Sequence, residues 1–432
     1  MKQSKFRETE IGEVPEEWDL LSIDEIGEVV GGGTPSTKVQ EFWDGDIAWL
    51  TPRDLSNYNL RYVSRGERNI SRKGLEKSSA KILPPNSVLL TTRAPVGYVA
   101  IARNDISTNQ GFRSVIPKKG VSSEYLYYLL KNNTHYLKSH ASGTTFGELA
   151  GSTLRSLKFA FPNFDEQKSI AKIFSDLESK IELNQKINKT LEAIGQAIFK
   201  HWFADFEFPN EKGKPYKSSG GEMVDSELGE IPRGWKIGEL TEFLDFLEGP
   251  GIRNWQYTLG GTRFINIRLI KNNDIDIANA NYVSNEEAHG KYKHFLLEEK
   301  DMIVSTSGTL GRTAIVRKKH LPLMLNTSVI RFRPIDAESY PFMYQYLNSS
   351  LFYNELKSLA SGSVQLNFGP MHLKSMKMLM PAKEILNLYN KSVSCVYDKI
   401  VSNLDKSDIL SHLRDSLLPR LMSGRIRVGI NL

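Results

Sequence analysis

Few side chains in this sequence have the types and spacings that covalent chemistry requires. Cys395 is the one cysteine, the eight histidines have no partnered spacing, and neither H-E-x-x-H nor C-x-x-C occurs. A single cysteine excludes a thiolate zinc cluster. GGGTPSTK, which begins at Gly31, lacks the G-x-x-x-x-G-K-[ST] spacing that cradles phosphates. We therefore predict a chain that binds no metal or cofactor and performs no covalent chemistry.

Polar residues of another kind gather in loops, at equivalent places in two halves of the sequence. Arginine, asparagine and glutamine can hold a base edge with two hydrogen bonds, so these loops are candidate base-reading elements. In the first half the candidates are Arg53, Thr92, Arg93, Tyr98, Asn109, Gln110, Thr144 and Thr145. In the second half they are Arg268, Ser307, Thr309, Arg312, Asn326, Ser363, Gln365 and Asn367. A structural role is the alternative for each of them.

The two halves are copies of one unit. ETEIGEVPEEW at residues 8–18 returns as DSELGEIPRGW at residues 225–235. NSVLLTTRAPVGYVAI, from Asn86, pairs with KDMIVSTSGTLGRTAI, from Lys300, and ASGTTFGELAGSTLRSLKFAFP, from Ala141, pairs with ASGSVQLNFGPMHLKSMKMLMP, from Ala360. The offset is nearly constant, and a period of roughly 215 residues is far too long for a solenoid. The sequence therefore predicts two equivalent domains.

Each copy changes texture once along its length. Short apolar runs such as SVLLTT and DMIVST, broken by glycine, proline and asparagine, indicate strands with a few helices. After Pro162 and again after Pro381 the pattern becomes helical. We predict an α+β fold in which mixed α/β domains, at residues 1–162 and 209–381 (the latter with a linker), are each followed by a long helix, at residues 163–208 and 382–432.

Both predicted helices carry a coiled-coil seam, whose positions alternate at spacings of four and three over about four heptads. The seam comprises Ile170, Phe174, Leu177, Ile181, Asn184, Asn188, Leu191, Gly195 and Ile198 in the first helix, and Tyr389, Val393, Val396, Ile400, Asn403, Ser407, Leu410, Arg414 and Leu417 in the second. We expect the two helices to pair with each other. Apolar residues off the seam either pack against the chain's own domains or form a docking face for another protein.

Charge is distributed unevenly along the 432 residues, whose net charge is +6. Residues 51–158 hold 17 Lys and Arg against 6 Asp and Glu, an excess of 11. Such a local excess attracts a polyanion, most commonly the phosphate backbone of nucleic acid, although a solvated basic surface gives the same pattern. With one cysteine and no run of eighteen apolar residues, the sequence predicts a soluble cytoplasmic protein.

The repeated openings, the ASGTTF and ASGSVQ segments, and the helix ends AIFKHWFADFEFP and LLPRLMSGRIRV resemble the specificity subunit of type I restriction-modification systems, over essentially the whole chain. The resemblance implies two target recognition domains that read the two halves of a split sequence in double-stranded DNA, held apart by two antiparallel helices. It also implies two methyltransferase subunits that flip and methylate adenine, and motor nuclease subunits for cleavage. Those partners would use S-adenosylmethionine, ATP and Mg.

Two other functions stay open on the residues alone. One is an autonomous DNA methyltransferase or nuclease with unrecognised motifs, and the other is a coiled-coil adaptor that does not bind DNA. The second domain also departs from the first, because it lacks the dense positive run of residues 61–81, so its phosphate contacts must lie elsewhere. An antiparallel pairing about a pseudo-twofold axis further predicts that the equivalent residues Asn184 and Asn403 meet.

Overall fold

The computed structural model describes residues 5–56, 58, 60–143, 147–271, 273–306, 311–359 and 368–428. The chain divides into two compact units, of which the first comprises Met1–Asn184 with Asp405–Leu432 and the second Gln185–Leu404. Each unit combines mixed sheets with short helices and with a part of each of two long helices. The predicted α+β duplication is therefore confirmed.

The first unit is built on a five-stranded sheet of order β4-β11-β8-β9-β6 and a three-stranded sheet of order β10-β5-β7. Its strands are β1 (Phe6–Thr9), β2 (Gly12–Pro15), β3 (Asp19–Ser22), β4 (Gly27–Gly31), β5 (Trp43–Leu50), β6 (Tyr62–Val63), β7 (Arg68–Ile70), β8 (Val88–Thr92), β9 (Val96–Ala102), β10 (Ser107–Thr108), β11 (Arg113–Pro117) and β12 (Lys158–Phe161). Its short helices are α1 (Ile23–Ile26), α2 (Arg72–Glu76), α3 (Ser123–Asn132), α4 (Thr134–Ser139) and α5 (Gly151–Ser156).

The apolar run VLLTT forms the central strand of the larger sheet. β8 pairs antiparallel with β9 on one side and with β11 on the other, and each of its residues is buried. A strand covered on both faces needs consecutive rather than alternating apolar residues, and Val88, Leu89 and Leu90 provide them before the buried threonines Thr91 and Thr92. Helix α3 covers this core with a run of buried tyrosine and leucine side chains, and the Ser122 hydroxyl caps it by accepting a hydrogen bond from the Tyr125 amide.

The second unit repeats this plan. Its strands are β13 (Met223–Val224), β14 (Ile231–Pro232), β15 (Lys236–Glu239), β16 (Leu244–Glu248), β17 (Thr262–Phe264), β18 (Ile270–Lys271), β19 (Asp274–Ile275), β20 (Asn281–Val283), β21 (Met302–Ser305), β22 (Thr313–Ile315), β23 (Leu323–Met324), β24 (Val329–Pro334) and β25 (Lys377–Met380). Its short helices are α7 (Asn285–His289), α8 (Tyr340–Leu347), α9 (Ser350–Leu359) and α10 (Pro370–Lys374). The sheet orders β16-β24-β21-β22 and β20-β17-β23 follow those of the first unit, except that the larger sheet has four strands here and lacks the place that β6 takes.

The long helices are α6 (Phe164–Phe203) and α11 (Lys383–Met422). α6 begins where the Asn163 side chain accepts a hydrogen bond from the Glu166 amide, at 3.0 Å. The carboxylates of Asp165 and Glu166 in its first turn interact favourably with the positive end of the helix dipole. Within the first unit, contacts join Glu166 to Arg427, Glu178 to Arg414 and Asn184 to Ser407. Residue numbers rise along α6 as they fall along the opposite segment, so the helices pair antiparallel.

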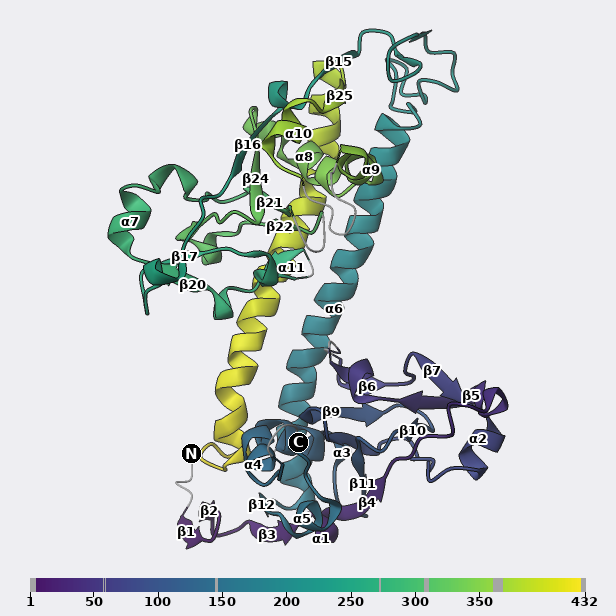
Figure 1. Cartoon of the computed structure of the whole chain (residues 1–432), viewed down its shortest axis with the longest axis vertical. Helices are drawn as coiled ribbons and strands as arrows, with labels where there is room; N and C mark the ends of the chain where they lie inside the picture. Colours follow the sequence, from purple (N-terminus) through teal and green to yellow (C-terminus); the bar gives the residue numbers. More distant parts are fainter. Residues whose placement is uncertain are drawn as a thin grey trace. The chain divides into compact units, whose positions relative to one another are not determined.

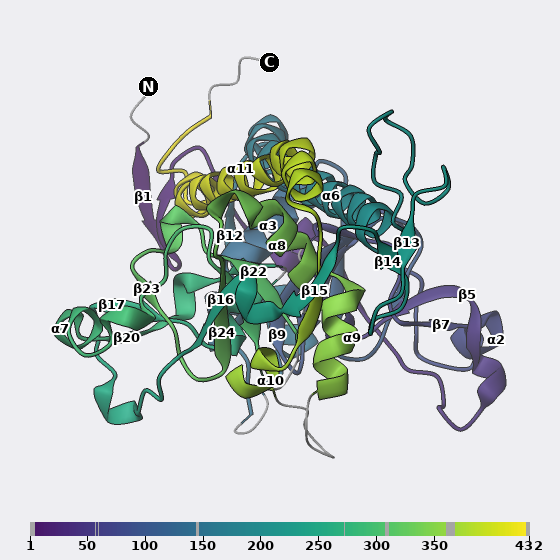
Figure 2. The same cartoon turned by 90° about the horizontal axis from the view of Figure 1, so that it is seen from above.

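The three-stranded sheet of each unit lies away from the long helices. In the first unit, β5, β7 and α2 stand at the side of the domain far from α6, in both directions of view (Figures 1 and 2). In the second unit, β17, β20 and α7 likewise stand at the side far from α11 (Figures 1 and 2). Each unit therefore presents one distal sheet and one helix-proximal core.

Candidate nucleic-acid interface

In the first unit, candidate base-reading residues meet at the ends of two parallel strands. β10 pairs parallel to β5, with Ser107 opposite Trp49. The Asn109 amide then donates to the Leu50 carbonyl at 2.8 Å. Because parallel strands end at the same sheet edge, Arg53 after β5 lies at the same edge as Asn109 and Gln110 after β10.

The hairpin between β8 and β9 joins this edge. The Thr92 amide donates to the Gly111 carbonyl at 2.8 Å, which holds the hairpin turn beside the loop of residues 109–111. Arg93 at the turn is exposed, and its Nε lies 3.8 Å from Oε2 of Glu148. Tyr98 is on β9 and half-buried. Thr92 is only 1% exposed, which favours a structural role for its side chain.

The second unit places its candidates in the same way. β23 pairs parallel to β17, and the Ile265 amide donates to the Met324 carbonyl at 2.8 Å. Arg268 follows β17 and Asn326 follows β23, so both lie at one sheet edge. Arg268 is exposed, and its Nη2 donates to Oδ1 of Asn281 at 3.2 Å. Arg312 is exposed just before β22, at the hairpin that corresponds to the β8–β9 turn.

Two glycines allow these loops to pack closely. A Cβ atom on Gly32 would lie 2.0 Å from the Asn109 carbonyl oxygen, and one on Gly249 would lie 2.4 Å from the Asn326 amide nitrogen. Both are backbone atoms, so any larger residue would displace the loop that carries the candidate amide. The glycine-rich stretch that begins at Gly31 thus has a packing function, in agreement with its lack of a phosphate-binding spacing.

Seven of the candidates are outside the described residues. They are Thr144, Thr145, Ser307, Thr309, Ser363, Gln365 and Asn367. Nine are described, and apart from Thr92 and Tyr98 they are exposed or half-buried at corresponding sheet edges, namely Arg53, Arg93, Asn109, Gln110, Arg268, Arg312 and Asn326.

Arg61 shows that the basic run of residues 61–81 is not wholly a solvent-facing surface. Its side chain is 8% exposed, and its guanidinium donates to the Tyr128 hydroxyl at 3.0 Å. Tyr128 donates in turn to Glu178 of α6 at 2.7 Å. Burial, reinforced by the Glu178 carboxylate, raises the pKa of Tyr128 and keeps its hydroxyl protonated. Arg61 therefore joins the domain to the helix.

The equivalent junction of the second unit is neutral in charge at its centre. Tyr397 occupies the place of Glu178 and packs on Tyr344, with ring centroids 4.9 Å apart. Gln196 of α6 donates to the Gln345 carbonyl at 3.2 Å. Nearby, the Tyr344 hydroxyl donates to Glu192 at 3.3 Å. Burial raises the pKa of Glu192, and hydrogen bonds from Asn273 and Tyr344 oppose that shift.

The seam positions are placed unevenly. Ile170, Phe174, Tyr389, Val393 and Ile400 are buried with Asn184, Asn188 and Asn403, whereas Leu177, Ile181, Leu191, Ile198, Val396, Leu410 and Leu417 are half-buried. Asn184 donates to Ser407 at 3.1 Å, and Asn403 donates to Asn188 at 2.8 Å. The expected meeting of Asn184 with Asn403 stays a prediction.

An ion pair that the sequence reasoning missed also occurs twice. Lys158 on β12 binds Glu10 at 2.7 Å, and Lys377 on β25 binds Glu227 at 2.6 Å. Each pair fastens the repeated opening segment to the last strand of its domain. The signal was available, because both members recur at the repeat offset, but two exposed opposite charges far apart in sequence do not predict a contact.

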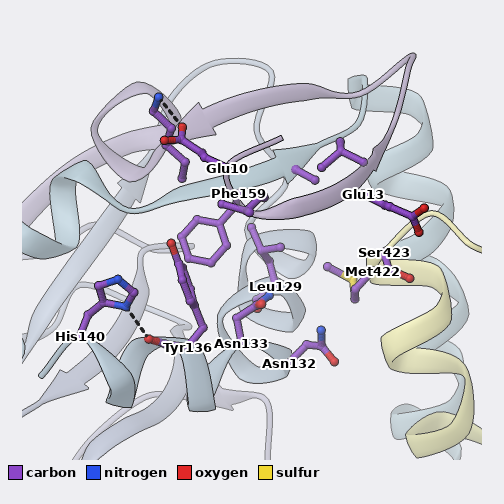
Figure 3. Close-up of a pocket in the computed structure, with 14 residues that line it drawn as sticks. Glu10, Glu13, Leu129, Asn132, Asn133, Tyr136, His140, Phe159, Met422 and Ser423 are labelled. Carbon is purple, nitrogen blue, oxygen red and sulfur yellow. Dashed lines mark hydrogen bonds and ion pairs between the residues drawn. The ribbon is translucent and has the colours of Figure 1, made fainter. Parts of the chain in front are cut away.

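A pocket of about 590 Å³ lies beside the first of these ion pairs. Figure 3 shows Tyr136 and Phe159 along its wall and Met422, from the end of α11, on the other side. The second unit carries larger side chains at corresponding positions, with Tyr346 for Leu129, Leu379 for Ala160 and Phe203 for Met422.

Along the described residues, no helix is long and apolar enough to cross a membrane. The same residues contain no cluster of three or more His, Cys, Asp or Glu that could hold a metal ion. Each unit has a sheet edge that carries arginine and amide side chains, and each is attached to the pair of long helices. This is the architecture of a duplicated recognition protein.

Comparison with known proteins identifies the class. The family model described as "Type I restriction modification DNA specificity domain" matches residues 15–193 and 232–414. The MjaIX type I restriction enzyme specificity subunit of Methanocaldococcus jannaschii is 38% identical over 99% of this chain and 97% of its own length. The HindI specificity subunit of Haemophilus influenzae is 28% identical over 71% of this chain and 78% of its own length.

A solved structure shares the fold. The S subunit of a type I restriction-modification system from M. genitalium superposes with a TM-score of 0.50 over 97% of this chain and 99% of its own, at 16% identity. The chain belongs to the family of type I restriction-modification DNA specificity subunits. Members of this family recognise DNA and are not themselves catalytic, which excludes the autonomous enzyme and the adaptor without DNA binding.

Proposed function

We propose that this chain reads a bipartite target in double-stranded DNA, one half-site with each unit, and holds two methyltransferase subunits that methylate adenine. Motor nuclease subunits would join for cleavage. The partners, rather than this chain, would use S-adenosylmethionine, ATP and Mg, and the complex would act in the cytoplasm. The recognition domains would occupy residues 1–162 and 209–381, with helical regions at 163–208 and 382–432.

The observation that carries the proposal is the repeated sheet edge. Each unit brings an arginine after one strand and an amide after a parallel neighbour to the same edge, Arg53 with Asn109 and Arg268 with Asn326. Arginine and asparagine are the side chains that read guanine and adenine edges in the major groove. The surrounding loops differ in sequence between the copies, which supports two different half-sites.

The docking proposal has a separate basis on the helices. Ile194 on α6 and Leu413 on α11 are equivalent in the repeat, and each is 44% exposed. Apolar side chains that stay in water at equivalent places favour two equivalent contacts with a protein partner. Both lie off the predicted seam, where the sequence left packing or docking open.

Arg53→Ala and Arg268→Ala form a matched pair of tests. Loss of one base contact costs ~1–3 kcal/mol and relaxes readout at that base. The chain is co-expressed with its methyltransferase partner, and methylated adenines are mapped across the genome. We expect each variant to relax one half of the recognised sequence and to leave the other half unchanged.

Arg233→Ala is the control, because Arg233 directly follows β14, is 68% exposed and pairs with Glu222 rather than with a candidate residue. A uniform loss of affinity on every DNA, with a shallower salt dependence, would instead make Arg53 or Arg268 a phosphate contact. An unchanged sequence preference at both half-sites in both variants would overturn the assignment of the sheet edges.

A further inference from the structure

The loop between β16 and β17, residues 249–261, exposes large apolar side chains. Trp255 is 80% exposed, Leu259 is fully exposed and Tyr257 is 39% exposed. The other five tryptophans of the chain are buried or half-buried. Single exposed apolar residues are ordinary, but three within five positions on one loop are a feature that needs an explanation.

Hydrogen bonds attach the loop to the rest of the unit, so the exposed side chains stand on an ordered backbone. Gln256, next to Trp255, is 7% exposed, and its Nε2 donates to Oε1 of Glu287 and to the Tyr292 hydroxyl, each at 3.1 Å. Its Oε1 accepts from the Arg253 amide at 3.0 Å. A buried amide with partners on two other elements fixes the backbone on which Trp255 stands.

The far end of the loop is anchored as well. The Thr258 amide donates to the Tyr282 carbonyl on β20 at 3.0 Å, and the ring of Tyr257 lies 5.2 Å from that of Phe264 on β17. These contacts attach the loop to the distal three-stranded sheet (Figures 1 and 2). The anchored residues 256–258 therefore lie between the exposed residues Trp255 and Leu259.

The loop borders the candidate base-reading edge. It starts at Gly249, whose backbone packs against Asn326, and it ends at β17, which leads directly to Arg268. Residues 249–273 contain the cations Arg253, Arg263, Arg268 and Lys271 and no carboxylate, and of these cations Lys271 is paired with Asp276 at 2.7 Å. Of the carboxylates nearby, Glu287 is bonded to Gln256, and burial raises the pKa of Glu248. A positive segment of this kind favours a polyanionic ligand over an acidic or neutral protein surface.

Resting on the proposed function, we propose that Trp255 and Leu259 form an apolar wedge that enters a groove of the DNA half-site read by the second unit. There they pack against the base pairs, while Arg253 and Arg263 neutralise adjacent phosphates. Apolar side chains that enter a groove partly unstack a base step, and an aromatic ring gains stacking on the exposed base face.

The test is the affinity of the full chain for a duplex that carries its methylated target, with Trp255→Ala and Trp255→Phe compared. Loss of one base-stacking contact weakens binding about 10- to 100-fold, whereas a phenyl ring keeps most of it. The dependence of affinity on salt should stay unchanged in Trp255→Ala, because no phosphate contact is removed. Ile335→Ala is the control, since Ile335 is 61% exposed in the same unit.

Tryptophan fluorescence supplies a second readout, because Trp255 is the exposed tryptophan. Target DNA should protect the wild-type signal from acrylamide and have little effect on that of Trp255→Phe. Unchanged affinity of Trp255→Ala for DNA that the wild type binds would overturn the wedge alone. So would normal DNA binding with lost capture of the methyltransferase partner, which would assign the loop to a protein. A wild-type chain that binds no duplex would overturn the proposed function as well.

Discussion

The two units join their recognition domains to the long helices with different chemistry. In the first unit a carboxylate, Glu178, is 6% exposed and accepts from Tyr128 at 2.7 Å. Lys131 lies 3.4 Å from it, Arg414 of α11 lies 3.5 Å away and Arg61 lies 4.0 Å away. One buried charge therefore holds three cations that come from the domain and from the opposite helix.

The second unit has no charge at the corresponding position. Tyr397 replaces Glu178, Gln345 replaces Tyr128, and Gly195 replaces Arg414 at the repeat offset. A Cβ atom on Gly195 would lie 2.2 Å from Nε2 of Gln345 and 3.0 Å from the Tyr397 hydroxyl. The space that an arginine fills in one junction is closed by a tyrosine and a glutamine in the other.

The difference teaches that duplication has preserved the shape of the junction rather than its interactions. A buried ion cluster is only weakly stabilising as a whole, because desolvation offsets the attraction, but the loss of one member leaves uncompensated charge. An aromatic and amide junction depends on packing, which responds to volume. The two junctions should therefore fail for different reasons.

Glu178→Gln is expected to have the largest effect. It keeps the volume of the side chain and leaves Arg61, Lys131 and Arg414 without their shared carboxylate, at a cost of ~3–5 kcal/mol to the first unit. Urea unfolding followed by hydrogen exchange in each unit measures it. Asp176→Asn on the same helix is the control, because that ion pair is exposed and should contribute less than ~1 kcal/mol. Equal effects of the two substitutions would contradict the ionic junction.

Gly195→Ala should have the next largest effect on stability, and this effect should fall on the second unit. Alanine in a helix is favoured over glycine by ~1 kcal/mol, but here the added methyl overpacks Gln345 and Tyr397 at a cost of ~1–3 kcal/mol. Hydrogen exchange in the second unit reports the net change. Gln345→Ala in the same chain makes room for the methyl, so the double variant should recover part of the loss. Stabilisation by Gly195→Ala alone would show that the junction is loosely packed.

Glu192→Gln should have the smallest effect and the opposite sign. Burial raises the folded-state pKa of Glu192 above its unfolded value, so the folded unit binds more protons in the pH range just above ~4.3. Stability is then lost as pH rises through that range, and the deficit persists at neutral pH. Glutamine removes it and should stabilise the second unit by less than ~1 kcal/mol at pH 7. Unfolding titrations of the wild type and of Glu192→Gln from pH 4 to pH 8 test this, and a gain from the substitution that does not grow as pH rises would refute it.

The duplication and the long helices could be predicted from sequence because both leave periodic signals. The prediction of the seam is less accurate. It places Leu177 and Val396 in the buried face, whereas their neighbours Glu178 and Tyr397 are the buried residues. A heptad pattern describes helix pairing alone, whereas here α3 and α8 also pack on the helices, with Tyr128 on Phe174 and Tyr344 on Tyr397. Because α3 and α8 cover the long helices, the buried positions shift by one residue, from Leu177 to Glu178 and from Val396 to Tyr397.

The candidate interface was predictable by residue type but not by geometry. Arg53 and Asn109 share an edge only because β10 returns parallel to β5, a pairing that neither segment encodes locally. Thr92 was grouped with its exposed neighbours, although it ends the central strand of the sheet and is buried there. The loop at Trp255 corresponds to the loop between β4 and β5, whose residues 32–42 contain no tryptophan, so the comparison of the two copies gave no signal for it.

The polar contacts of the seam obey the internal repeat of the chain. Asn184 donates to Ser407, and Asn403 donates to Asn188. The repeat offset maps Asn184 onto Asn403 and Ser407 onto Asn188, so donor corresponds to donor and acceptor to acceptor. In a pair of identical half-chains, Asn184 of each would face Asn188 of the other with the same hydrogen-bond polarity. A gene shortened to its first half would thus encode a self-complementary seam.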